Sequence, residues 1–234
     1  SAAMQLRANV DAELKRRRTD PRDDLLTSLA HAEIDGTRLS DGEIHASVML
    51  LLIIGVETTA SLIANAIRAL AEQPAMMRRV RDDRTLVWNL IEETLRHDAP
   101  VQGLYRKARR DVEIAGAQIK TGDALCVLYA AANRDPSYVE CPANFNLDSA
   151  RRDHLAFGKG VHECPGAGLA RMEAEVAINA VLDKFETLTP IPADELAPSP
   201  ISARFLRAPA EQALAFTLTA APRRVDSVSP YGFR

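Results

Sequence analysis

One cysteine in this sequence stands where a reactive or metal-ligating thiol would be expected. Cys164 lies in the stretch FGKGVHECPG, residues 157–166, behind two glycines and directly ahead of Pro165. Proline favours the first turn of a helix, so we predict that Cys164 caps a helix that runs to about Lys184. The free amides and the dipole at a helix start favour an anion, which predicts a stable thiolate.

Four interpretations of Cys164 are open on these residues alone. It could be a small buried residue of the core, or a zinc ligand together with His162, although further ligands at usable spacing are missing. It could be a catalytic nucleophile, which would need a second histidine and an oxyanion site. The fourth interpretation is an axial thiolate ligand of haem iron. Gly158 and Gly160 allow a tight turn that brings amides toward the sulfur, and Gly166 leaves room for a flat ligand.

The elements that must position this loop are predicted to be mostly helical. Apolar spacing and cap signals predict helices over residues 4–18, 23–32, 41–72, from 74 onward, 85–97 and 165–184. Ser40 and Glu43 form a capping box at the start of the longest helix, which at 1.5 Å per residue would be about 48 Å long. Its middle, residues 49–54, is apolar on every face and is predicted to be buried.

Strands are predicted only after Pro100. Residues 111–130, DVEIAGAQIKTGDALCVLYA, alternate apolar and polar side chains around two glycines, which indicates a hairpin or meander of short strands. Residues 133–162 are loop-like, 190–200 form a proline-rich connector, and 213–220, ALAFTLTA, are predicted to be a terminal strand. The predicted fold class is mainly α with small β-sheets, in a single domain over residues 1–234.

Composition sets limits on the class of protein. The 234 residues are 47% hydrophobic and 26% charged, as expected for a soluble globular chain. A net charge of −3 and a pI near 6.0 argue against a nucleic-acid partner. Basic clusters at 15–18, 78–81 and 106–110 are interpreted mostly as solvated faces.

Three features of the sequence predict a cytoplasmic protein. Three cysteines without regular spacing argue against a disulfide framework. Residues 7–18 are charged where a signal peptide would need an apolar core. The apolar run 48–56 is shorter than the about 20 residues that a bilayer requires, so no membrane partner is expected.

The cysteine stretch resembles the haem-binding signature of the cytochrome P450 family and matches it at every fixed position. Three further stretches follow the family's order: GVETT at 55–59, EETLR at 92–96 and RKARRDVEIAG at 106–116. Residues 154–171, HLAFGKGVHECPGAGLAR, are similar to the soluble bacterial branch. The resemblance implies the C-terminal half of the cytochrome P450 fold, with its long distal helix and proximal cysteine loop, without the N-terminal part.

The resemblance also implies a role for each matching residue around haem b. Cys164 would be the metal ligand, and His162 and Arg106 would donate to the haem propionates. Further cofactor-binding positions are Phe157, Gly158, Gly160, Gly166 and Gly55. Glu57 and Thr58 would be the catalytic acid and alcohol of the distal helix, which hold water and deliver protons. Glu93 and Arg96 would form a structural ion pair under the haem loop.

The implied activity is a haem-thiolate monooxygenase. It would insert one oxygen atom of O2 into a small organic substrate, by hydroxylation or epoxidation, with electrons from a ferredoxin-type donor and its reductase. An alternative from another class is a catalytically silent or incomplete haem-binding or interaction protein derived from the same fold.

The missing N-terminal half and the departures at Ile54 and Ser149 motivate that alternative. Ile54 stands before Gly55 where a small residue is usual, so a branched side chain is expected to crowd the oxygen or substrate side. Ser149 replaces an expected loop arginine, and Asn146 stands where aspartate is common. Arg151 or Arg152 is the expected substitute in the ion network.

Overall fold

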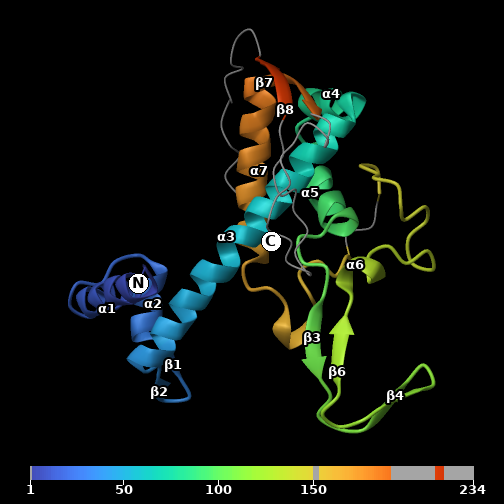
Figure 1. Cartoon of the computed structure of the whole chain (residues 1–234). Coiled ribbons are helices and arrows are strands. Elements are labelled where there is room, and N and C mark those ends of the chain that lie inside the picture. Colours follow the sequence, from blue (N-terminus) through green and yellow to red (C-terminus); the bar gives the residue numbers. More distant parts are fainter. Residues whose placement is uncertain (1, 150–152, 191–213, 219–234) are drawn as a thin grey trace. The chain divides into compact units, whose positions relative to one another are not determined.

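The computed structural model describes residues 2–149, 153–190 and 214–218 (Figure 1). The chain divides into two compact units, Ser1–Glu57 and Thr58–Arg234, and helix α3 contributes to both. The elements that begin in the first unit are α1 (Ala2–Thr19), α2 (Leu25–His31), β1 (Glu33–Ile34), β2 (Thr37–Arg38) and α3 (Asp41–Glu72).

The second unit contains the remaining helices and strands. Its helices are α4 (Pro74–Asp82), α5 (Leu86–His97), α6 (Tyr129–Ala132), the 3-10 turn η1 (Gly160–His162) and α7 (Ala167–Lys184). Its strands are β3 (Leu104–Lys107), β4 (Val112–Ile114), β5 (Ala117–Ile119), β6 (Ala124–Val127), β7 (Phe185–Pro190) and β8 (Leu214–Leu218). The predicted class, mainly α with small sheets, is confirmed.

The first unit has a small core of its own. Leu14 of α1, Ala30 of α2 and Ile44 of α3 are buried against one another. Asp24 caps α2, because one carboxylate oxygen accepts the Thr27 backbone N–H at 2.8 Å. The helix predicted over 23–32 is therefore present but begins just after this cap.

Helix α3 has the predicted bounds and the predicted capping box. The backbone N–H of Ser40 donates to Glu43 Oε2 at 2.8 Å, and the backbone N–H of Glu43 donates to Ser40 Oγ at 3.3 Å. By length and composition α3 as a whole is long and apolar enough to cross a membrane, although the run 48–56 alone is too short. One such helix is weak evidence of membrane association, because the core helix of a soluble protein can have the same length and apolar composition.

The predicted burial of the middle of α3 is wrong for the described residues. Leu50, Leu52 and Ile53 are 57%, 45% and 68% exposed. Burial of an apolar segment is favourable, but its composition does not show which other segment packs against it.

The core of the second unit lies between four helices. Buried apolar side chains from the later part of α3 meet those of α4, α5 and α7, among them Leu70, Val80, Leu90 and Ile178. Helix α7 contacts both α4 and α5, and β7 continues directly from its end (Figure 1). The cysteine loop, residues 157–166, directly precedes α7. This core therefore holds in place the helix to which the loop is attached.

One residue of the basic cluster 78–81 is part of this core, contrary to the expectation of a solvated face. The Arg81 side chain is 6% exposed, and it donates to the carbonyl oxygens of Leu182 and Phe185 at 3.3 and 2.5 Å. These are carbonyls at the C-terminal end of α7, where the helix has no donors of its own. Arg81 therefore caps α7 from a neighbouring helix.

The strands form four two-stranded antiparallel sheets among the described residues. Arg106 lies opposite Leu125 in the β3–β6 pair, and the β4–β5 hairpin lies at the far end of this ribbon (Figure 1). The predicted terminal strand is β8, but its partner β7 was not predicted. The predicted connector 190–200 lies outside the described residues apart from Pro190.

Candidate functional site

The cysteine loop is closed by a hydrogen bond between its two ends. The backbone N–H of Cys164 donates to the carbonyl oxygen of Phe157 at 2.8 Å, and Gly158 N–H donates to Leu155 at 2.9 Å. Gly158 and Gly160 have φ of 73° and 79°, in the region that side chains disfavour, so the tight turn needs glycine at both positions. The loop therefore has the turned conformation that its glycines predict.

The position of Cys164 relative to α7 differs from the prediction. The helix begins at Ala167 with Gly166 as its cap, and the Cys164 carbonyl accepts the Ala167 N–H at 3.3 Å in the turn before it. Pro165 thus lies in this turn rather than in the first turn of the helix. Cys164 is half-buried, and all three cysteines are free thiols.

Arg106 on β3 is held by a residue that was not predicted. Its Nη2 donates to the hydroxyl oxygen of Tyr129 at 3.1 Å, and its Nη1 donates to the Tyr105 carbonyl at 2.9 Å. Tyr129 is 9% exposed and begins α6, which follows β6 in the chain. Since β3 and β6 are paired, a tyrosine just after the second strand is within reach of an arginine on the first. His162 ends η1 and is exposed.

The distal candidates are consecutive residues of α3. Gly55 and Glu57 are exposed in the first unit, and Thr58 is half-buried as the first residue of the second unit. Ile54 is 49% exposed, so within the first unit this branched side chain is largely uncovered. The geometry at this position consists of a carboxylate followed directly by a hydroxyl on one helix.

Glu93 and Arg96 form a buried ion pair on α5. Arg96 Nη2 and Nε donate to Glu93 Oε1 and Oε2 at 2.7 and 2.8 Å, and both side chains are at most 5% exposed. Arg96 also donates to the carbonyl oxygens of Asn133, Pro142 and Asn144 at 3.3, 3.0 and 2.8 Å. The pair thereby ties α5 to the long loop, residues 133–159, that leads to the cysteine.

The same loop partners Glu93 through its backbone. The Asn146 N–H donates to Glu93 Oε1 at 2.7 Å, and the Asn146 side-chain oxygen accepts the Asp148 N–H at 2.9 Å. An asparagine can make this turn as an aspartate would, which accounts for the departure at this position. Arg151 and Arg152, the predicted substitutes for the arginine missing at Ser149, lie outside the described residues.

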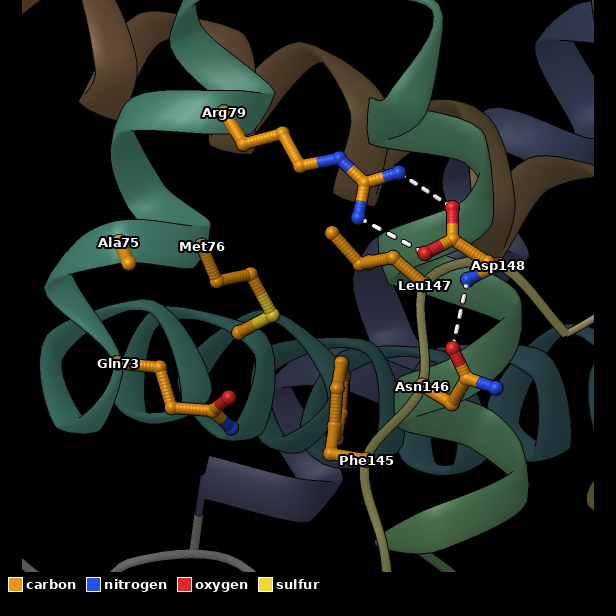
Figure 2. A pocket seen from close by; sticks show the side chains of 8 residues that line it. All are labelled: Gln73, Ala75, Met76, Arg79, Phe145, Asn146, Leu147 and Asp148. Carbon is orange, nitrogen blue, oxygen red and sulfur yellow. Dashed lines mark hydrogen bonds and ion pairs between the residues drawn. The ribbon is translucent and has the colours of Figure 1, made fainter.

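Two pockets border this loop in the second unit. The first lies between α4 and residues 145–148, where Arg79 forms an ion pair with Asp148 across the opening (Figure 2). No predicted site residue lines it. The second is lined by residues of the long loop and its neighbours, including Arg96, His154 and Lys159, so it adjoins both the buried ion pair and the cysteine loop.

Sequence reasoning also missed two charged residues close to the cysteine loop. Glu92, the first glutamate of EETLR, forms an ion pair with Arg171 of α7 at 2.6 Å. The available signal was the pair of adjacent glutamates, because residues 92 and 93 point about 100° apart around a helix and need different partners.

Comparison with known proteins identifies the family. The family model for cytochrome P450 matches residues 2–216. The chain is 42% identical to cytochrome P450 107B1 of Saccharopolyspora erythraea, an alignment that covers 75% of this chain and 44% of that protein. It is 40% identical to the cyclomarin C epoxidase CymV of Salinispora arenicola, over 77% of this chain and 46% of that protein.

Solved structures agree with the sequence matches. The chain superposes on cytochrome P450 CYP109Q5 from Chondromyces apiculatus with a TM-score of 0.87 and 36% identity, over 94% of this chain and 56% of that one. Substrate-free CYP109E1 from Bacillus megaterium gives a TM-score of 0.84 at 35% identity, over 90% of this chain and 54% of that one. The chain spans about half the length of the relatives it matches. On these grounds it belongs to the cytochrome P450 family.

Proposed function

We propose that this chain is the haem-binding portion of a bacterial-type monooxygenase, with Cys164 as the thiolate ligand of haem b. Haem b is the cofactor of the cytochrome P450 family, to which the chain belongs. The observation that carries the proposal is the closed, glycine-turned loop that holds a free thiol between Phe157 and Gly166.

The described residues supply a donor set that fits this cofactor. Cys164 is a half-buried free thiol, and a soft sulfur is suited to iron. Gly166 has no side chain to occupy the space beside the sulfur, where a Cβ would lie in van der Waals contact at 3.9 Å. Arg106 and His162 are exposed N–H donors of the kind that pair with propionate carboxylates.

Each residue would then have a defined task. When bound, the haem supplies the redox chemistry that activates dioxygen, and thiolate ligation favours O–O cleavage. Arg106 and His162 would orient the propionates, while the Glu93–Arg96 pair would support the loop from below. The carboxyl group of Glu57 would supply protons, and Thr58 Oγ1 would hold the water that relays them.

The proposal extends to the substrate and the electron donor. We propose a small organic substrate that is hydroxylated or epoxidised, and electrons from a ferredoxin-type protein with its reductase. CymV, named an epoxidase, supports an oxygen-insertion reaction of this type. A cytoplasmic location is part of the proposal and rests on the bacterial relatives.

The experiment that tests the activity compares the parent protein with Thr58→Ala in an oxygen-consumption assay. Surrogate ferredoxin and reductase supply electrons, and both peroxide and product are measured. Positioned proton transfer is worth about 100-fold to 10,000-fold. We therefore expect Thr58→Ala to retain haem while the product formed per electron falls and peroxide rises.

Two outcomes would contradict this proposal. Equal coupling of electrons to product in parent and Thr58→Ala would refute the role of Glu57 and Thr58. A parent that binds haem through Cys164 but consumes no oxygen would favour the catalytically silent haem-binding protein, for which Ile54→Ala is the rescue to try.

A further inference from the structure

A second buried charged cluster lies beside the ion pair of α5. Glu92 is 5% exposed, and its two partners come from separate parts of the chain: His154 from the long loop and Arg171 from α7. The His154 side chain is 3% exposed, with Nε2 at 3.3 Å from Glu92 Oε2. That contact is an ion pair when the imidazole is protonated, and the ring nitrogen makes no directed hydrogen bond there.

Arg171 is held by both oxygens of Glu92. Its Nε donates to Oε1 at 2.6 Å and its Nη2 to Oε2 at 3.1 Å, which is the forked geometry that fixes the plane of a guanidinium. Burial by itself would raise the pKa of Glu92, but the contact with His154 and the hydrogen bonds and charge of Arg171 outweigh it and lower that pKa. Glu92 therefore stays a carboxylate, and the fork is maintained.

The fixed guanidinium lies against the first residue of the cysteine loop. The Arg171 Cζ is 4.5 Å from the centre of the Phe157 ring, within range of a cation–π contact, and 5.8 Å from that of Trp88. The His154 ring lies 6.0 Å from the same Phe157 ring. Two partners of Glu92 thus hold one aromatic side chain.

Phe157 passes this restraint to the sulfur-bearing residue, because its carbonyl oxygen accepts the Cys164 N–H at 2.8 Å. We infer that Glu92 and Arg171 are positioning residues that fix the orientation of Phe157 and thereby the conformation of the Cys164 loop. Arg171 touches neither the sulfur nor any residue proposed to bind the propionates among the contacts described, so it acts through Phe157. This inference rests on the proposed function only for its consequence at the haem.

A lysine at position 171 separates positioning from charge. Arg171→Lys keeps a cation but loses the two-point fork and the flat group over Phe157. The matched control is Arg79→Lys, which makes the same change in an exposed ion pair with Asp148 (Figure 2). Glu92→Gln provides a second variant that keeps the shape of the carboxylate, should lysine at 171 prevent folding.

The first measurement needs no cofactor. Amide hydrogen exchange at Cys164 in the haem-free chain should be about tenfold faster in Arg171→Lys than in the parent, and unchanged in Arg79→Lys. Glu92→Gln should show an intermediate increase. Unchanged exchange at Cys164 in folded Arg171→Lys and Glu92→Gln would overturn the inference.

The second measurement uses the haem-loaded chain. After reduction and addition of carbon monoxide, the Arg171→Lys variant should lose part of the absorbance band typical of thiolate-ligated haem. The Arg79→Lys variant should keep all of it. If the parent itself lacks this band, the proposed function fails, whereas the exchange measurement still decides whether Arg171 positions the loop. A full thiolate band in Arg171→Lys would contradict the consequence at the haem.

Discussion

At the scale of single residues, two adjacent carboxylates of α5 bind different partners. Glu93 pairs with Arg96 and receives a backbone N–H from Asn146, while Glu92 pairs with Arg171. Both carboxylates are buried, and a buried charge is tolerated only where partners compensate its desolvation. One helix turn therefore anchors both the long loop and the helix on either side of Cys164.

Removing the charge of Glu93 should destabilise the fold rather than the chemistry. Glu93→Gln leaves Arg96 buried without its counterion, which typically costs about 3 to 5 kcal/mol in the free energy of unfolding. The matched control is Glu72→Gln, in which a half-exposed glutamate 3.4 Å from Arg68 loses its charge, with an expected change of about 0.5 kcal/mol. Urea titration measures both. Normal stability with selective loss of turnover in Glu93→Gln would be evidence for a catalytic role instead.

At the scale of elements, the start of α2 depends on an ionised carboxylate. Asp24 accepts the Thr27 N–H and is paired with Arg17, and these bonds lower its pKa to about 2. Because the folded-state pKa lies below the unfolded value of about 4, the stabilisation is present above pH 4 and is lost as pH falls toward 2.

Nuclear magnetic resonance can follow this loss at the cap itself. We expect the Thr27 amide shift to titrate with a midpoint near 2 in the parent, reporting Asp24. In Asp24→Asn the amide side chain still caps the helix but does not titrate, so the step should vanish. A midpoint near 4 in the parent would show that the carboxylate gains nothing from the cap.

The end of α7 depends on Arg81. In Arg81→Ala the carbonyl oxygens of Leu182 and Phe185 lose a charged donor, and one such hydrogen bond contributes about 1.5 to 3 kcal/mol. We expect the free energy of unfolding to fall by at least that amount. Arg78→Ala, at an exposed position of the same helix, should change it by no more than about 0.5 kcal/mol. Equal effects of the two substitutions in urea titration would exclude a capping role for Arg81.

Elements with strong local signals could be predicted from the sequence. The capping box at Ser40 and the proline at 74 define helix starts through local chemistry, and both are confirmed. The start of α7 was misplaced by two residues because Pro165 is equally compatible with the preceding turn. Strand β7 was missed because its partner β8 is remote in sequence, and pairing over that distance leaves no local signal.

At the scale of the whole molecule, the family and its cysteine loop could be predicted because ten consecutive residues carry the motif. The supports of the loop were harder to predict, since Tyr129, Glu92 and Arg171 act through contacts between elements that have no fixed spacing in the sequence. The exposure of the middle of α3 was equally hard to predict, because burial depends on what packs against a segment as well as on its composition.

The most direct test of the central claim is the absorbance spectrum of the haem-loaded chain after reduction under carbon monoxide. If Cys164 is the axial ligand, the parent shows the band of thiolate-ligated haem and Cys164→Ala lacks it. The controls Cys126→Ala and Cys141→Ala remove exposed thiols and should leave the band unchanged. The same thiolate band in Cys164→Ala, or its loss in either control alone, would contradict the assignment of Cys164 as the ligand.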